Sequence, residues 1–177
     1  AADGRVFERM NPISGEVASK VAAATVEDAR QAANAAAKAF PAWAATGPGT
    51  RRALLMKAAD ALEARAQAFA EAMIAENGAT FGWAMFNVEL AAGVVREAAA
   101  ITTQITGEVI PSDKPGCIAM ALKEPVGVIL GIAPWNGPIV LGVRAIAVPL
   151  ACGNTVILKA SETCPRTHEL IYEAFLE

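Results

Sequence analysis

The sequence is poor in the residues that build metal sites and in positive charge. It holds one histidine and three widely spaced cysteines among 177 residues, without a Cys-x-x-Cys pair, so the spacing typical of a zinc site is absent and a histidine-rich zinc site is excluded. Lysine and arginine number 15 against 18 aspartate and glutamate residues, for a net charge of −3. This balance argues against a protein that binds nucleic acid by neutralising phosphates. We expect neither a bound metal nor a nucleic-acid partner.

An uninterrupted apolar run long enough to cross a membrane is also lacking. The most apolar stretch, residues 126–150, is broken by Pro134, Asn136, Pro138 and Arg144, which favours buried structure over a spanning helix. The first ten residues contain no apolar core of a secretory signal. Three scattered cysteines suit buried thiols in a reducing compartment, so the expected location is cytoplasmic, without membrane partners.

What is present favours helices first and a parallel sheet later. Hydrophobic residues make up 54% of the chain, which excludes disorder. Residues 5–24 carry a turn signal between two short strands. Helices are expected over 25–40, where Pro41 ends the first, over 50–77 with a stop at Asn77-Gly78, and over 88–105.

A strand–helix–strand–helix order follows in the last third of the chain. Residues 117–123 and 126–132 are short apolar runs, and the second is continuously apolar, as in a strand covered on both faces. A helix is expected from Pro138 to Cys152, a strand over 155–159, and a last helix from Pro165 to the end at Glu177. This order indicates a βαβ unit and an α/β fold with a parallel sheet.

Ligands of such sheets bind beyond the carboxyl ends of the strands. No Gly-x-Gly-x-x-Gly turn is present, so the usual pyrophosphate loop is absent. Glu162 and Lys159, after the second strand, suit a ribose contact that disfavours a 2′-phosphate; alternatively they are a solvated pair. Asn136, after the first strand, can donate to an oxyanion; alternatively it bonds its own backbone in a turn. Trp135 by itself suggests packing.

These two segments together carry a family resemblance. Pro134-Trp135-Asn136, the Gly-Asn-Thr of residues 153–155 and the Lys-Ala-Ser-Glu-Thr-Cys-Pro of residues 159–165 resemble the NAD(P)-dependent aldehyde dehydrogenase superfamily, with Ala160 where many members have proline. NPISGEV at 11–17 and KEPVGV at 123–128 agree. The chain is most similar to bacterial members that act on aromatic aldehydes, namely salicylaldehyde, vanillin and benzaldehyde.

The resemblance implies a Rossmann-like parallel sheet with N-terminal helices and a β-arm for oligomerisation. Residues 1–106 and 127–177 would be parts of the cofactor-binding domain, and 107–126 the arm. The catalytic domain would be absent from this chain, as would the nucleophilic cysteine and the general-base glutamate, which lie beyond residue 177 in family members. The expected assembly is a homodimer or homotetramer.

The resemblance also assigns roles to individual residues. Asn136 matches the oxyanion-hole amide, and the cofactor, NAD with NADP possible, would contact residues on both loops: Ile132, Ala133, Pro134, Trp135, Lys159, Ser161 and Glu162. The implied reaction is oxidation of a small aldehyde, salicylaldehyde first, to the acid through a cysteine thiohemiacetal and thioester. A non-catalytic nucleotide- or partner-binding chain, or an acylating reductase of the same superfamily, is the alternative.

Three residues are candidates for the substrate pocket. Arg144 sits inside an apolar helix, where it is expected to be buried or to line a cleft and to hold a hydroxyl, phenolate or carboxylate; the alternative is a structural pair with a glutamate. Gly137 would leave room for a ring. Trp83, near Met85 and Phe86, would stack on an aromatic aldehyde; the alternative is core packing.

Overall fold

The computed structural model describes residues 4–176 of the chain. Its elements follow in the order β1 (Val6–Met10), β2 (Val17–Ala22), α1 (Val26–Ala44), α2 (Pro48–Ala64), α3 (Ala66–Asn77), α4 (Phe81–Ile101), β3 (Glu108–Ile110), β4 (Ala119–Ala121), β5 (Val128–Ile132), α5 (Pro138–Ala151), β6 (Thr155–Lys159) and α6 (Pro165–Phe175). Helices and strands are therefore mixed in the expected order, with the parallel pair in the last third.

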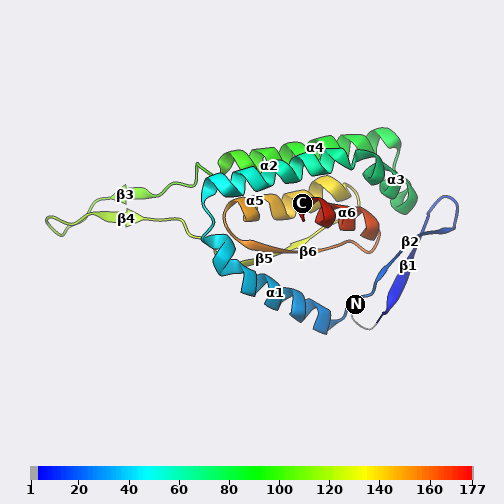
Figure 1. Ribbon diagram of the computed structural model, residues 1–177, viewed down its shortest axis with the longest axis horizontal. Helices are drawn as coiled ribbons and strands as arrows, with labels where there is room; N and C mark the ends of the chain where they lie inside the picture. Colours follow the sequence, from blue (N-terminus) through cyan, green and yellow to red (C-terminus); the bar gives the residue numbers. More distant parts are fainter. Residues whose placement is uncertain (1–3, 177) are drawn as a thin grey trace.

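The body of the molecule consists of stacked layers (Figure 1). Helices α2 and α4 lie side by side in one outer layer, α5 and α6 form the next layer, β5 and β6 lie beneath these, and α1 runs along the opposite side. The core is made of the helices: its largest fully buried apolar side chains include Leu62, Phe69, Met73 and Ile139. The β1–β2 hairpin and the β3–β4 hairpin project at opposite ends.

Strands β5 and β6 pair in parallel, with α5 as the crossover between them. The crossover lies very close to the sheet, because an added Cβ on Gly131 would come within 2.9 Å of the Ala145 Cβ. On its other side α5 packs against α6, where a Cβ on Gly142 would come within 2.8 Å of Ile171. Small residues thus allow α5 to fit between β5 and α6.

The first expected helix is confirmed, but its end is wrong. Thr25 and Asp28 form a capping box at the start of α1. Pro41 does not terminate the helix, which continues to Ala44. A proline removes one hydrogen bond without preventing the next turn, and this turn is held from outside because the Trp43 indole N–H donates to the Leu150 carbonyl over 3.1 Å.

The helix expected over 50–77 is two helices, and the one expected over 88–105 starts earlier. The chain breaks at Arg65 (φ −100°, ψ 12°) between α2 and α3, and α3 ends as expected at Asn77, with Gly78 in the left-handed region at φ +72°. Helix α4 begins at Phe81, capped by the Thr80 side chain. Its first turn carries exposed aromatic side chains, so an apolar-stripe criterion misses it.

Strand β5 is not covered on both faces within the described residues. The side chains of Val128, Leu130 and Ile132 are exposed to 38%, 59% and 68%. Strand side chains alternate between faces, so Ile129 and Gly131 face α5 while the other three point to the opposite side. There α1 packs mainly against β6, which leaves one face of β5 open.

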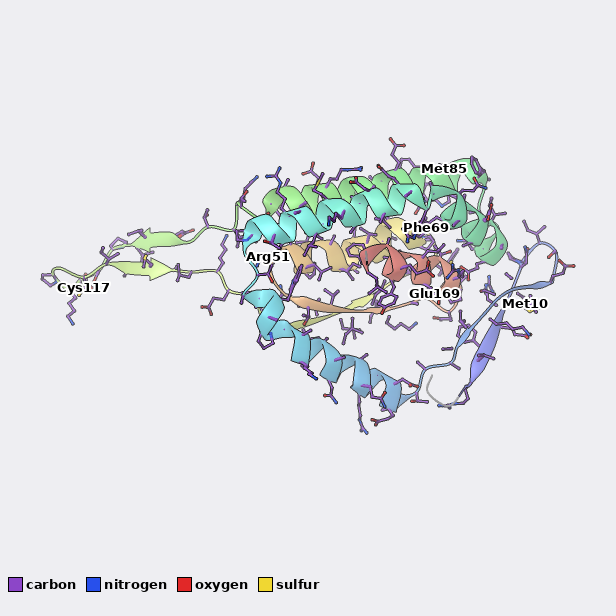
Figure 2. The ribbon with its side chains drawn as sticks, viewed as in Figure 1. Met10, Arg51, Phe69, Met85, Cys117 and Glu169 are labelled. Carbon is purple, nitrogen blue, oxygen red and sulfur yellow. The ribbon has the colours of Figure 1, made fainter. Side chains whose placement is uncertain are left out.

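The expected arm, residues 107–126, contains the β3–β4 hairpin, which projects from the body with Cys117 near its tip (Figure 2). The strand expected over 117–123 is only Ala119–Ala121. The last helix starts at Pro165 as expected but ends at Phe175, and Glu177 lies outside the described residues. None of the helices in residues 4–176 has the length and apolarity needed to cross a membrane.

Candidate functional site

The two segments that carry the sequence motifs leave the sheet side by side. Ile132, the last residue of β5, pairs with Lys159, the last residue of β6. The Ala133 N–H then donates to the Lys159 carbonyl over 3.0 Å. The loop of residues 133–137 and the loop of residues 160–164 therefore start at the same carboxyl edge, where parallel sheets bind ligands.

Asn136 presents an exposed amide at this edge. Its side chain is exposed and forms no hydrogen bond within residues 4–176, so the alternative of a turn asparagine bonded to its own backbone does not apply. Its carbonyl accepts a 3.4 Å hydrogen bond from the Trp83 indole N–H. The Asn136 amide N–H groups can donate to an anionic oxygen.

The residues before Asn136 differ in exposure. Ile132, Pro134 and Trp135 are exposed, while Ala133 is buried. Trp135 is 57% exposed, so it does not fill the core. Its carbonyl accepts a hydrogen bond of 3.2 Å from the Asn77 side-chain amide. This segment thus offers three exposed residues to a ligand and one that anchors it.

Lys159 and Glu162 form a solvent-exposed ion pair on the second loop. The Lys159 Nζ lies 2.9 Å from a Glu162 carboxylate oxygen. The Glu162 backbone N–H, and then the Lys159 ammonium, hold the pKa of this carboxyl below its usual range. The pair leaves further donors and acceptors free toward solvent. This arrangement suits a contact with ribose hydroxyls, and it equally suits the alternative of a solvated ion pair.

Ser161 is buried within its loop. Its side chain is buried, and its hydroxyl accepts a hydrogen bond from the Thr163 N–H over 3.2 Å. Its own N–H donates to the His168 Nδ1 over 3.1 Å. The short side chain thus caps a turn, and its expected contact with the cofactor stays a prediction.

Trp83 and Phe86 form an exposed aromatic pair beside the Asn136 loop. Their rings are stacked with centroids 5.5 Å apart and planes inclined by 21°, and 45% and 49% of these residues are exposed. Core packing is therefore wrong for both, whereas Met85 does pack against the core. The aromatic surface is available to stack on a planar ligand.

Gly137 is buried between α4 and α5. An added Cβ would lie 3.4 to 3.5 Å from Val140, Leu141 and the Asn87 side-chain oxygen. That Asn87 oxygen is buried and has no hydrogen-bond partner among the described residues, although the amide nitrogen donates to the Trp83 carbonyl over 3.0 Å. A Cβ at 137 would therefore make ordinary van der Waals contacts beside an unpaired acceptor.

Arg144 is not buried, so of its two expected placements only the lining of a cleft stays a prediction. The residue is exposed on α5, and within residues 4–176 it forms neither an ion pair nor a hydrogen bond. The structural pair with a glutamate is therefore not formed here either. Helix α5 buries Ile139, Val143 and Ile146 against its neighbours, and the 100° step per residue directs Arg144 to the outer side.

Three polar residues that were not expected at the site hold the two loops and the start of α6. Asn77 contacts the Trp135 carbonyl, and the His168 ring connects Ser161 to the Pro138 carbonyl, which lies 3.1 Å from its Nε2. Glu76 is 1% exposed and accepts hydrogen bonds from the backbone at the start of α6. Glu76 lies seven residues, or about two helical turns, after Phe69 and so on the same apolar helix face. A charged residue on such a face could have indicated a buried role from the sequence, whereas nothing in the sequence indicated the contacts of Asn77 and His168.

The described residues contain no group of three side chains able to hold a metal ion. The cysteines are free thiols. Burial, followed by the Glu76 charge, raises the pKa of the Cys164 thiol to about 11, which makes it a poor nucleophile at neutral pH.

Comparison with known proteins gives consistent findings. Residues 1–177 match the profile of the Aldehyde dehydrogenase family. A vanillin dehydrogenase of Pseudomonas fluorescens is 62% identical over 171 residues, which cover 97% of this chain and 35% of that protein. The structure of a salicylaldehyde dehydrogenase from Pseudomonas putida G7, complexed with salicylaldehyde, is 51% identical with a TM-score of 0.97, covering 99% of this chain and 36% of that one.

A third structure, a NAD-dependent benzaldehyde dehydrogenase from Corynebacterium glutamicum, is 32% identical with a TM-score of 0.90 and covers 97% of this chain and 38% of that one. The chain therefore spans little more than a third of the length of the relatives it matches.

His168 should make stability depend on pH. Burial lowers its pKa to about 4 from the ordinary 6.5. The unfolded chain thus binds this proton more tightly, so the stability from neutral His168 is complete above about pH 7 and is lost as the pH falls from about 6.5 to about 4, by roughly 3 kcal/mol. Urea unfolding of the native protein across this range should show the decline. In His168→Gln the decline of the free energy of unfolding with falling pH should be smaller. An unchanged dependence on pH would contradict the attribution of this decline to His168.

Proposed function

Because this chain belongs to the aldehyde dehydrogenase family, we propose that the native protein containing it oxidises an aromatic aldehyde to the carboxylic acid with NAD. The observation that carries the proposal is the exposed Asn136 amide at the carboxyl edge of the β5–β6 pair, next to the Trp83–Phe86 aromatic surface. An oxyanion donor suits the aldehyde group of such a substrate, and a stacking surface suits its ring.

Asn136 acts in this proposal on the aldehyde oxygen. Attack of a cysteine thiolate on the carbonyl carbon forms a C–S bond and leaves the oxygen negatively charged. The Asn136 N–H donors stabilise that charge. They do so again for the oxyanion that forms when water adds to the thioester, before the acid and the thiolate are released. NAD supplies the acceptor for the hydride that leaves the substrate carbon between these steps.

The thiolate and the base that activates water are proposed to come from residues after 177. The cysteines of this chain suit the role poorly. Cys164 is buried with a raised pKa, and Cys117 lies on the projecting arm. Cys152 follows the last residue of α5, about 20 Å along the helix from Gly137.

The cofactor site is proposed to include Lys159 and Glu162 as contacts to the ribose hydroxyls. Their exposed charged groups at the end of β6 support this assignment. The Glu162 carboxylate accepts hydrogen bonds from hydroxyls and repels a 2′-phosphate, which favours NAD over NADP. Ile132, Pro134 and Trp135 are exposed on the neighbouring loop and would line the same ligand, while Ala133 and Ser161 shape the loops from inside.

Salicylaldehyde is the substrate that we propose first. Trp83 stacks on the ring, the glycine at 137 leaves space beside it, and the exposed guanidinium of Arg144 binds the ring hydroxyl or phenolate. The exposure of Arg144 without a protein partner supports a ligand role. Two matched relatives are named for vanillin and for salicylaldehyde. Both of these aldehydes carry a hydroxylated aromatic ring, which agrees with this assignment.

The arm is proposed to join copies of the protein into a homodimer or homotetramer. Five large apolar side chains on the arm are exposed by 61% or more, namely Val109, Ile118, Met120, Leu122 and Val126. A two-stranded hairpin is unstable alone in water, and an apolar surface of this kind marks a contact. We also propose a cytoplasmic location, with the three free thiols as its support.

Asn136→Ala should lower kcat of the native enzyme about a hundredfold while leaving the Kd for NAD nearly unchanged, because the lost donor acts on the developing oxyanion. Folding should be unaffected, since the side chain makes no hydrogen bond in the described residues. Steady-state kinetics with salicylaldehyde and fluorescence titration with NAD test this. Asn11→Ala, in the β1–β2 turn, is the control; full turnover in Asn136→Ala would refute the oxyanion role.

Glu162→Gln should raise the ratio of kcat/KM for NADP to that for NAD by about tenfold, because it removes a negative charge near the ribose 2′ position. The measurement is kcat/KM with each cofactor at one salicylaldehyde concentration. Glu169→Gln removes an exposed carboxylate from α6 that pairs with Arg166 and serves as the matched control. An equal ratio in wild type and Glu162→Gln would contradict the ribose assignment.

Arg144→Ala should raise the KM for salicylaldehyde about tenfold more than the KM for benzaldehyde, because only the hydroxylated ring uses the guanidinium. Michaelis constants for both aldehydes at saturating NAD measure the difference. Arg30→Ala, on the exposed side of α1, controls for loss of an arginine. Equal increases for the two aldehydes would assign Arg144 a structural role.

A further inference from the structure

Asn77 uses the two ends of its side-chain amide on different parts of the molecule. Its oxygen accepts a hydrogen bond from the Ala79 N–H over 3.0 Å, at the end of α3. Its nitrogen donates to the Trp135 carbonyl over 3.2 Å and lies 3.5 Å from the Cys164 sulfur. The sulfur in turn lies 3.7 Å from the same carbonyl. Helix α3 is thereby connected to the loop that carries Asn136, through Trp135, which follows Asn77 by 58 positions.

The end of α3 is a firm anchor for this contact. Glu76, next to Asn77, is buried, and its carboxylate accepts four hydrogen bonds of 2.7 to 3.0 Å: from the Ser19 hydroxyl, the Arg166 N–H, and the Thr167 N–H and hydroxyl. These bonds join β2, α3 and the first turn of α6. Buried charges are retained where such bonds satisfy them, so Asn77 is held by a part of the molecule that does not depend on the loop.

Both peptide groups that flank Asn136 are fixed from outside the loop. The Trp135 carbonyl belongs to the same planar unit as the Asn136 N–H, and Asn77 holds it. The Asn136 carbonyl belongs to the next unit, and the Trp83 indole holds it over 3.4 Å. With both planes fixed, the direction of the Asn136 Cα–Cβ bond is fixed, and with it the place where the exposed amide can donate.

We propose that Asn77 is a positioning residue that aims the Asn136 amide by holding the Trp135 carbonyl. This inference rests on the oxyanion role of Asn136 proposed above. An oxyanion donor stabilises a transition state only when it is held in place before the reaction, and a shift of about 1 Å can cost up to roughly a hundredfold in rate. Asn77 thus contributes to turnover without touching the aldehyde or NAD.

Two substitutions in the native enzyme isolate the donor. Asn77→Asp keeps the oxygen that accepts from Ala79 but replaces the donor with an acceptor that repels the Trp135 carbonyl. Asn77→Ser keeps a short acceptor for the same turn and is too short to reach that carbonyl. Asn11→Asp is the matched control: Asn11 uses only its side-chain oxygen, toward Ile13 and Ser14, in an exposed turn.

Each Asn77 variant should lower kcat for salicylaldehyde oxidation about tenfold, with the Kd for NAD changed by less than about twofold. Asn11→Asp should keep the wild-type kcat. Urea unfolding of every variant gives the fraction of folded enzyme, to which each kcat is referred. If Asn77→Asp does not fold, Asn77→Ser provides the test.

The distinguishing measurement is a double-mutant cycle with Asn136→Ala. If Asn77 acts through the Asn136 amide, its substitution in the Asn136→Ala background should change kcat by less than about twofold. Independent effects that multiply, or a wild-type kcat in folded Asn77 variants, would overturn the inference and leave the proposed function intact. A wild-type kcat in Asn136→Ala itself would overturn the proposed function and this inference together.

Discussion

The parallel pairing of β5 and β6 is the constraint on which the candidate site depends. Its register sets Ile132 beside Lys159, so the two loops leave one edge as neighbours. A parallel pair needs a crossover on the face of the sheet, and here α5 lies almost in contact with β5 at Gly131. Larger residues at Gly131 or Gly142 would push α5 off the strand or off α6, and would separate the loops.

Polar side chains from distant helices then turn neighbouring loops into a defined site. Asn77 and Trp83 hold the carbonyls on both sides of Asn136, and His168 joins the second loop to the first residue of α5. The His168 bonds are buried, where an unpaired group would be costly, whereas the bonds from Asn77 and Trp83 lie at the exposed surface of the loop. The loops therefore gain order from the helical layers, while the groups that face outward stay available.

Exposed large apolar side chains gather on three parts of the molecule. The aromatic pair on α4, the free face of β5 and the arm expose large apolar side chains, and all three belong to elements around the site or projecting from the body (Figure 1). Surfaces of this kind mark contacts with ligands or protein. They agree with a chain that spans little more than a third of its relatives' length.

The sequence by itself determined the parallel unit, the motif residues at its edge and most of the order of the elements, because capping boxes, prolines at helix starts and short apolar runs are local signals. It did not reveal the break at Arg65 that divides residues 50–77 into α2 and α3. It did not determine where α1 and α4 end or begin, since Pro41 is tolerated when Trp43 binds Leu150, and the first turn of α4 has no apolar stripe.

The outward direction of Arg144, the inward turn of Ser161 and the roles of Glu76, Asn77 and His168 were decided only by the tertiary structure. A helix face becomes inside or outside only when a neighbour packs on it, and a hydrogen bond such as that from Asn77 to Trp135 joins residues 58 positions apart. No local pattern encodes such a distance, because it is set by the packing of whole layers.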